Sequence, residues 1–220
     1  GVVYYPFRVD SDFLAWTGMD IEGAILLTHL QTHEQILFFD EPSDQKRLWE
    51  SITWDTRKIR ESGFVGKIMP RMELASLLES LEGEFLLPEN NVASTKKEYA
   101  MLRVMLAGKP ISSADRHLIA KRLVKSASDQ EKIKKAIQMT EKTYEYILEH
   151  IRPGMYEYEV EAMIAYQFRL QRGVEAFPSI IASGPSACTR HYTAHDRKIE
   201  AGDLVLIDFG IELDGYGADI

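Results

Sequence analysis

The sequence predicts an α/β (α+β) protein of two units, and three observations lead to this prediction. Residues 1 to about 90 alternate short apolar runs with turn residues and helical segments, which is typical of α/β folds. A long amphipathic helix follows, and the last stretch of the chain reads as β-structure. A chain of 220 residues can form one large domain or two domains of about 100 residues each.

The first unit is expected over residues 1–125, with its start incomplete. The runs AILLT and QILFF (24–28 and 35–39) predict two strands joined by a polar loop. Helices are expected over 44–63 and 71–83, each ending at a glycine, and 88–97 is rich in polar and helix-breaking residues and predicts a loop. Residues 97–125 predict a helix, a turn and a second helix with Ser112 or Ser113 as N-cap.

The second unit is expected over residues 126–220, with a boundary near Lys125. Its first helix ends at Pro153-Gly154, and the apolar residues Ile133, Ile137, Tyr144 and Ile147 are spaced as on one helix face. Another helix covers 157–172 and stops at Gly173, followed by strands.

Composition excludes several classes of protein. Hydrophobic content of 45% and charged content of 27% are ordinary for a globular protein. A net charge of −8 argues against a nucleic-acid partner, and no apolar run is long enough for a membrane span. The N-terminal residues lack the pattern of a secretory signal. Cys188 is the only cysteine, so no intrachain disulfide can form, and we expect a reducing, cytoplasmic location.

Two aspartates stand out in the closing segment LVLIDFGIELDGYGADI. The run LVLIDFGIEL is apolar at both alternating positions, so we expect it to be covered on both faces. Asp214-Gly215 predicts a two-residue hairpin turn. This turn sets Asp219 opposite Gly210 and therefore diagonal to Asp208 on the same face.

Two neighbouring carboxylates in apolar surroundings repel each other and lose hydration. They can share a proton, pair with a cationic side chain or bind a metal ion, and the hairpin contains no lysine or arginine. Oxygen ligands of this kind suit hard or borderline divalent ions such as manganese. The alternative is structural: Asp208 could cap a backbone group, and Asp219 could be exposed.

The segment GDLVLIDFGIELDGYGADI resembles the first half of the metal site in the pita-bread metallopeptidases, which include Xaa-Pro aminopeptidase (aminopeptidase P), prolidase, methionine aminopeptidase and creatinase. RPGMYEYEVEAMI and PSIIASGPSACTRHYTAHDRKIEAGD resemble segments that precede this site in the family. YYPFRVDSDFLAWTGM resembles the N-terminal domain of aminopeptidase P, and LIAKRLVKSASDQEKIKKA resembles its entry into the catalytic domain. Together these motifs span nearly the whole chain.

This resemblance implies a creatinase/prolidase-type N-terminal α/β domain followed by the first part of a pita-bread catalytic domain. It implies that Asp208 chelates one divalent ion, that Asp219 bridges two, and that His191 binds the substrate or the tetrahedral intermediate. The expected ions are Mn²⁺, with Co²⁺ or Zn²⁺ as alternatives, and water activated between them would attack the scissile carbonyl.

The family completes its site with one further His and two Glu, whose positions would lie after Ile220. We therefore expect the chain to be a fragment of a longer peptidase, truncated at both ends and inactive by itself. The family's pattern is also altered at four positions, which bear on substrate specificity more than on the fold: Ser186, Arg190, His195 and Phe209.

Other tempting residues are expected to be structural. His29 and His33 have the spacing of a zinc helix, but they fall in a hairpin loop. His195 lies four residues after His191, also in a loop, so we do not expect it to bind metal. Asp10 and Asp12 belong to a family signature with Arg8, for which ion pairing or a subunit contact is expected.

Three functions follow from the resemblance. The first is an aminopeptidase that cleaves an N-terminal residue from peptides with proline at the second position. The second is a prolidase that splits Xaa-Pro dipeptides, and the third is a non-catalytic, peptidase-like binding protein. The resemblance also implies a homodimer or a homotetramer, and neither a nucleic acid nor a membrane is an expected partner.

Overall fold

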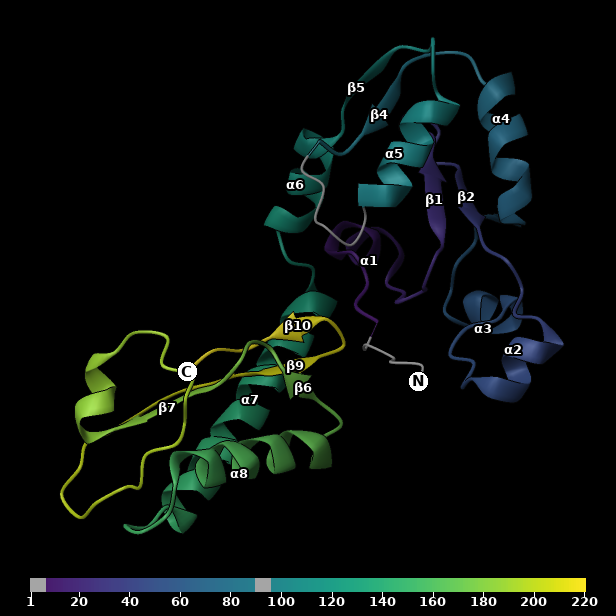
Figure 1. Ribbon diagram of the computed structural model, residues 1–220. Coiled ribbons are helices and arrows are strands. Elements are labelled where there is room, and N and C mark those ends of the chain that lie inside the picture. Colours follow the sequence, from purple (N-terminus) through teal and green to yellow (C-terminus); the bar gives the residue numbers. More distant parts are fainter. Residues whose placement is uncertain (1–6, 90–95) are drawn as a thin grey trace. The chain divides into compact units, whose positions relative to one another are not determined.

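The computed structural model describes residues 7–89 and 96–220, and the chain divides into two compact units, Gly1–Val124 and Lys125–Ile220 (Figure 1). The expected loop at 88–97 falls largely outside the described residues, as does the start of the first unit, which is expected to be incomplete. The elements of the first unit are α1 (Ser11–Thr17), β1 (Ile25–Thr28), β2 (Gln35–Phe38), α2 (Asp44–Trp49), α3 (Thr56–Glu61), β3 (Lys67–Met69), η1 (Arg71–Glu73), α4 (Leu74–Ser80), β4 (Phe85–Leu87), α5 (Lys96–Met105), β5 (Ile111–Ser113) and α6 (Asp115–Leu123).

Two small sheets organise the first unit. Strand β1 is antiparallel to β2, as a hairpin requires, and β2 is parallel to β3. Strands β4 and β5 form a separate parallel pair. The two strands expected from their apolar runs are confirmed, whereas β3, β4 and β5 were not expected. Each of these has only three residues, which is too short to show a period of two.

Strand β2 contributes to apolar clusters on both of its faces. Phe38 packs with Met69 and Leu74 in one cluster, and Leu37 packs with Ile59 in the other. Successive side chains of a strand point to opposite faces, so both faces of β2 are covered. This explains why three successive residues of β2, Ile36, Leu37 and Phe38, are apolar.

The single helix expected over 44–63 is wrong, because the chain forms α2 and α3 with an extended break between them. The side chain of Asp55 accepts a hydrogen bond from Lys58 N at 2.8 Å and caps a new helix. Immediately before it, Trp54 Nε1 donates to Asp20 Oδ1 at 2.6 Å. Ile52 and Thr53 are β-branched and have low helix propensity. A cap and a tertiary hydrogen bond therefore prevail over the helical pattern.

The second unit begins with the longest helix of the described chain. Its elements are α7 (Ala127–His150), α8 (Glu157–Leu170), β6 (Val174–Glu175), β7 (Ile180–Ser183), η2 (Gly184–Cys188), β8 (Val205–Asp208), β9 (Ile211–Leu213) and β10 (Tyr216–Gly217). Helix α7 packs against α8, β9 and β10 (Figure 1). The helices expected after residue 126 and over 157–172 are confirmed.

The buried face of α7 differs from the expected one. Ile137 and Tyr144 are exposed, and the fully or nearly fully buried positions are Ala136, Thr140, Thr143 and Ile147. The buried hydroxyl of Thr140 has two hydrogen-bond partners. Its Oγ1 donates to Ala136 O at 3.0 Å and accepts from Ile211 N at 3.3 Å. A hydroxyl therefore joins the helix to β9 at a position that the expected apolar set did not include.

The expected hairpin is present. Asp214 and Gly215 both have positive φ angles, 52° and 81°, as a type I′ turn requires. Strands β9 and β10 pair Tyr216 with Leu213 and Gly217 with Glu212. The apolar run before the turn is divided, since β8 pairs with β7 whereas β9 pairs with β6 and β10. Leu204 and Leu206 are exposed, so the expectation that both faces of the run are covered is wrong at these two positions.

Gly210 lies at the division between β8 and β9, where the two arms of the hairpin approach closely. A Cβ atom at this position would stand 1.8 Å from the carbonyl oxygen of Ala218. We expect Gly210→Ala to destabilise the intact protein by about 3 kcal/mol, because the backbone of the opposite arm must move. Denaturant-induced unfolding measures this change. Gly217→Ala is the matched control, since its Cβ would be 3.3 Å from Ala176 Cβ; an equal loss in both variants would contradict the explanation.

Candidate functional site

The hairpin brings Asp208 and Asp219 together in the predicted register. Phe209 and Ile220 exchange both backbone hydrogen bonds, each at 3.1 Å. Asp208 and Asp219 each precede one residue of this pair, so they are diagonal neighbours on the other face of the hairpin, and their charges interact. Asp208 ends β8, where it pairs with Ile180 of β7, whereas Asp219 is exposed.

The surroundings of Asp208 disfavour the charged form of its carboxyl group. Burial raises its pKa above the ordinary value, the negative charge of Asp219 raises it further, and His191 acts in the opposite direction. Its Oδ1 atom is buried and has no hydrogen-bond partner within the described residues. A buried polar atom without a partner is rare in proteins and costs free energy. This oxygen is therefore available to a ligand.

His191 lies in the segment 184–204 that connects β7 to β8. It is exposed, and its φ angle of 51° is in the left-handed region, which few residues other than glycine adopt. The charge that His191 can carry lowers the pKa of Asp208, so the imidazole lies within electrostatic range of that carboxyl. Asp208 thus interacts electrostatically with both Asp219 and His191.

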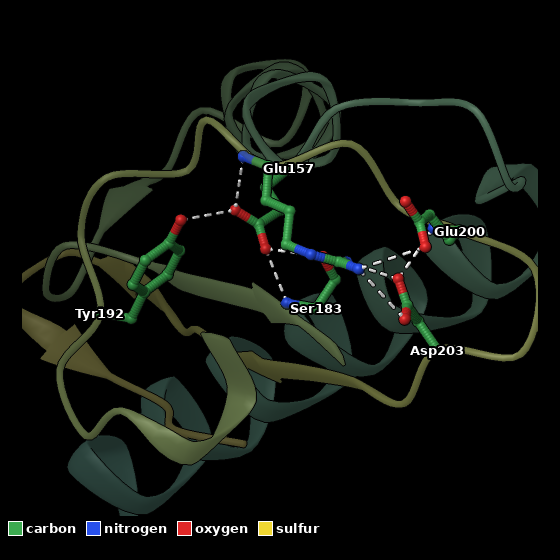
Figure 2. Close-up of polar contacts among 6 residues, drawn as sticks. Glu157, Ser183, Tyr192, Glu200 and Asp203 are labelled. Atoms are coloured by element: carbon green, nitrogen blue, oxygen red, sulfur yellow. Dashed lines mark hydrogen bonds and ion pairs between the residues drawn. The ribbon is translucent and has the colours of Figure 1, made fainter. Parts of the chain in front are cut away.

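Glu157 is a residue of this region that the sequence reasoning missed. It begins α8 and is fully buried. Figure 2 shows Ser183 and Tyr192 reaching its carboxylate from opposite sides. Oε1 accepts from Ser183 N at 2.6 Å and Ser183 Oγ at 2.7 Å. Oε2 accepts from Tyr192 Oη at 2.9 Å and Arg197 N at 3.1 Å.

These hydrogen bonds decide the charge state of Glu157. Burial by itself raises the pKa of this carboxyl, but the four donors outweigh burial and bring the pKa below its usual range. One signal in the sequence could have identified it. The helical spacing places Glu157 on the same face of α8 as the buried residues Val160, Ile164 and Phe168. A glutamate therefore occupies a position on the buried face where an apolar side chain is expected.

His195 is buried in the same segment and has two partners. Its Nδ1 is 3.0 Å from Glu161 Oε2, and its Nε2 lies 3.4 Å from the backbone N–H of Ile181. Both ring nitrogens therefore face protein atoms. The segment is not helical at this point, in agreement with the expectation of a loop.

A divalent cation fits the Asp208–Asp219 pair on chemical grounds. The charges of the two carboxylates oppose one another, and one oxygen of Asp208 is buried without a partner in the described part of the chain. Within residues 7–89 and 96–220 there is no group of three or more histidine, cysteine, aspartate or glutamate side chains arranged to hold a metal ion. Because each such ion takes about four to eight ligands, the pair supplies only part of a site.

In the first unit the ion pairing expected for Asp12 is confirmed, whereas Asp10 caps a helix. Asp10 caps α1 by accepting from the N–H groups of Asp12 and Phe13 at 3.0 and 3.1 Å. Asp12 forms an ion pair with Arg122 at 2.8 Å. His29 and His33 are exposed residues of the turn between β1 and β2, as expected.

Comparison with known proteins agrees with this geometry. Residues 131–220 match metallopeptidase family M24, and residues 1–84 match the N-terminal domain of aminopeptidase P. The chain belongs to the aminopeptidase P family. It is 30% identical over 228 residues to the Xaa-Pro aminopeptidase of Haemophilus influenzae, covering 98% of this chain and 51% of that protein. The chain thus spans about half the length of the curated relatives it matches.

Solved structures of aminopeptidase P have the same fold. Proline aminopeptidase P II from Yersinia pestis superimposes with a TM-score of 0.84 at 28% identity, over 98% of this chain and 53% of that one. Zn-substituted Escherichia coli aminopeptidase P in complex with product gives 0.84 at 26% identity, with the same coverage. The expected fold class, an N-terminal α/β domain followed by the first part of a pita-bread domain, is confirmed. No helix in the described ranges is sufficiently long and apolar to span a membrane.

The raised pKa of Asp208 leads to a stability prediction for the metal-free protein. A carboxyl whose folded pKa is raised stabilises the fold below its unfolded value, 3.8, and loses this contribution as the pH rises through the folded pKa. At pH 7 the charge of Asp208 therefore opposes folding. We expect Asp208→Asn to raise the melting temperature of the intact, chelator-treated protein at pH 7, with a smaller difference at pH 3. A lower melting temperature at pH 7 would contradict this account.

Proposed function

We propose that the full-length protein is a metal-dependent aminopeptidase that hydrolyses the bond between an N-terminal residue and a following proline. The observation that carries this proposal is the unpartnered buried oxygen of Asp208, beside Asp219 and close to His191. Both units match models of the family in which the similar proteins are named Xaa-Pro aminopeptidases.

Asp208 and Asp219 would hold the metal, with Asp208 chelating one divalent ion and Asp219 bridging two. Mn²⁺ is the proposed ion, with Co²⁺ or Zn²⁺ as alternatives. Bound ions of this kind activate water and polarise a carbonyl group. Metal binding would also stabilise the folded chain, because a cation relieves the repulsion between the two carboxylates and gives the buried oxygen of Asp208 a partner.

His191 would act on the substrate directly. Its side chain is exposed, so a peptide can reach the imidazole, and its N–H can donate to the carbonyl oxygen of the scissile bond. The same donor would stabilise the negative charge that develops on this oxygen when the carbonyl becomes tetrahedral.

We propose that residues 1–125 form the creatinase/prolidase-type N-terminal domain and that residues 126–220 begin the catalytic domain. A homodimer or homotetramer and a cytoplasmic location stay predictions, as does the absence of nucleic-acid and membrane partners. Ser186, Arg190 and Phe209 remain candidates for altered specificity; Phe209 is buried against Phe168, with ring centroids 6.0 Å apart.

A prolidase is the second candidate, and one comparison favours it. Over 101 residues, 45% of this chain, the sequence is 39% identical to the Xaa-Pro dipeptidase of Pyrococcus furiosus, although only 29% of that protein is covered. Assays with a tripeptide and a dipeptide that share the same Xaa-Pro bond separate the two. Cleavage of the dipeptide only would favour the prolidase. If the intact protein bound neither manganese nor cobalt, a non-catalytic binding protein would be favoured instead.

Substitution of the three site residues tests the proposed function in the full-length, manganese-loaded protein. Asp208→Ala and Asp219→Ala should reduce Xaa-Pro tripeptide hydrolysis to background and weaken manganese binding measured by calorimetry. His191→Ala should lower kcat about 100-fold or more because it removes a donor to the developing oxyanion, while manganese binding is retained. Glu149→Gln, an exposed position at the end of α7, is the control. Unchanged turnover in either aspartate variant would overturn the proposal.

A further inference from the structure

The segment 184–204 carries His191 but contains no long helix or strand of its own. We infer that Glu157 is a positioning residue that acts through Tyr192 to hold His191 beside Asp208. This inference rests on the proposed function, because it concerns how the chain orients the group that would meet the substrate.

Glu157 joins three parts of the second unit through one carboxylate. Oε1 holds the end of β7 at Ser183, and Oε2 holds Tyr192 and Arg197 in the connecting segment. Helix α8 carries the carboxylate and also donates two backbone bonds to the segment, from Glu157 N to Arg197 O at 3.0 Å and from Tyr158 N to His195 O at 2.9 Å. The carbonyls of the segment thus satisfy free N–H groups of the first turn of α8.

Glu157 is linked to His191 through Tyr192, the next residue of the chain. Tyr192 follows His191, and its hydroxyl is held between Glu157 Oε2 at 2.9 Å and Asp196 Oδ1 at 3.1 Å. His191 has the uncommon φ angle of 51°. Such a conformation persists only where the flanking structure imposes it. The anchor on Tyr192 supplies this restraint on the C-terminal side of His191.

The link to Asp208 runs through β7. Ser183, the residue bonded to Glu157, pairs with Val205, and three positions along the same ladder Ile180 pairs with Asp208. Glu157 therefore fixes His191 and the strand of Asp208 relative to the same two oxygen atoms. Loss of this link would leave both residues in place in the sequence but would loosen their mutual geometry.

The network requires a charged, fully accepting group. All four partners of the carboxylate donate to it, whereas a glutamine side chain has a single acceptor oxygen and would turn its amide N–H₂ toward two donors. Arg197 adds positive charge nearby, with Nη1 2.8 Å from Ser183 Oγ and a further contact to Asp203. Buried ionic networks contribute little net stability relative to apolar packing, so specific geometry is the better reason for this one.

Tyr192→Phe tests the inference in the full-length protein, because it removes only the hydroxyl and leaves the Ser183 and Arg197 bonds intact. We expect kcat for an Xaa-Pro tripeptide to fall about 10- to 100-fold, as for a misplaced reacting group, with KM changed less than about twofold. In a His191→Ala background the same substitution should cause no further loss, because Tyr192 acts through His191. Tyr166→Phe, exposed on α8, is the matched control. An equal loss in both backgrounds would overturn the inference.

Amide hydrogen exchange provides a readout that does not depend on activity. In the full-length protein, Tyr192→Phe should increase exchange in residues 189–193, and Glu157→Gln should increase it further and extend it to Ser183 and Arg197, whose N–H groups bond to Glu157. Unchanged exchange in 189–193 would overturn the inference even in an active enzyme. Increased exchange in a protein without peptidase activity would support the anchoring of His191 and would count against the proposed function only.

Discussion

The buried carboxylate of Glu157 is the constraint on which the second unit depends. A charge can be buried in a protein only when donors replace its hydration, and Glu157 takes these donors from β7 and from the segment that follows it. The first turn of α8 donates in the opposite direction, to two carbonyls of that segment. An irregular stretch of chain is thereby anchored through several hydrogen bonds, and it is the stretch that carries His191.

A second carboxylate in the same unit behaves in the opposite way, and the contrast locates the site. Burial disfavours the charge of both Glu157 and Asp208. Glu157 is compensated by hydrogen bonds, and its pKa falls below its usual value. Asp208 meets the charge of Asp219 instead, its pKa rises, and one of its oxygens lacks a partner in the described chain. The fold supplies hydrogen-bond donors to the carboxylate of Glu157, whereas the buried oxygen of Asp208 still needs a partner.

Sequence reasoning failed at places where distant residues determine local structure. The helix expected over 44–63 is divided because Trp54 bonds to Asp20 and Asp55 caps a new helix. The buried face of α7 includes Thr140, whose hydroxyl bonds to the backbone of β9, although Ile137 fitted the apolar pattern better. Glu157 is a related case: its phase with the apolar stripe of α8 marks it in the sequence, but the donors that allow its carboxylate to be buried come from distant residues.

The sequence by itself determined the features that depend on near neighbours. Asp214-Gly215 specifies a tight turn, and the turn sets the register that brings Asp219 diagonal to Asp208; the α/β pattern and the long helix are similarly local. Only the tertiary structure decided which carboxylate is hydrogen-bonded, where the apolar run divides between two sheets, and that His191 lies near the pair. These properties depend on groups that are far apart in the chain, and the free energy of a buried charge is set by what surrounds it.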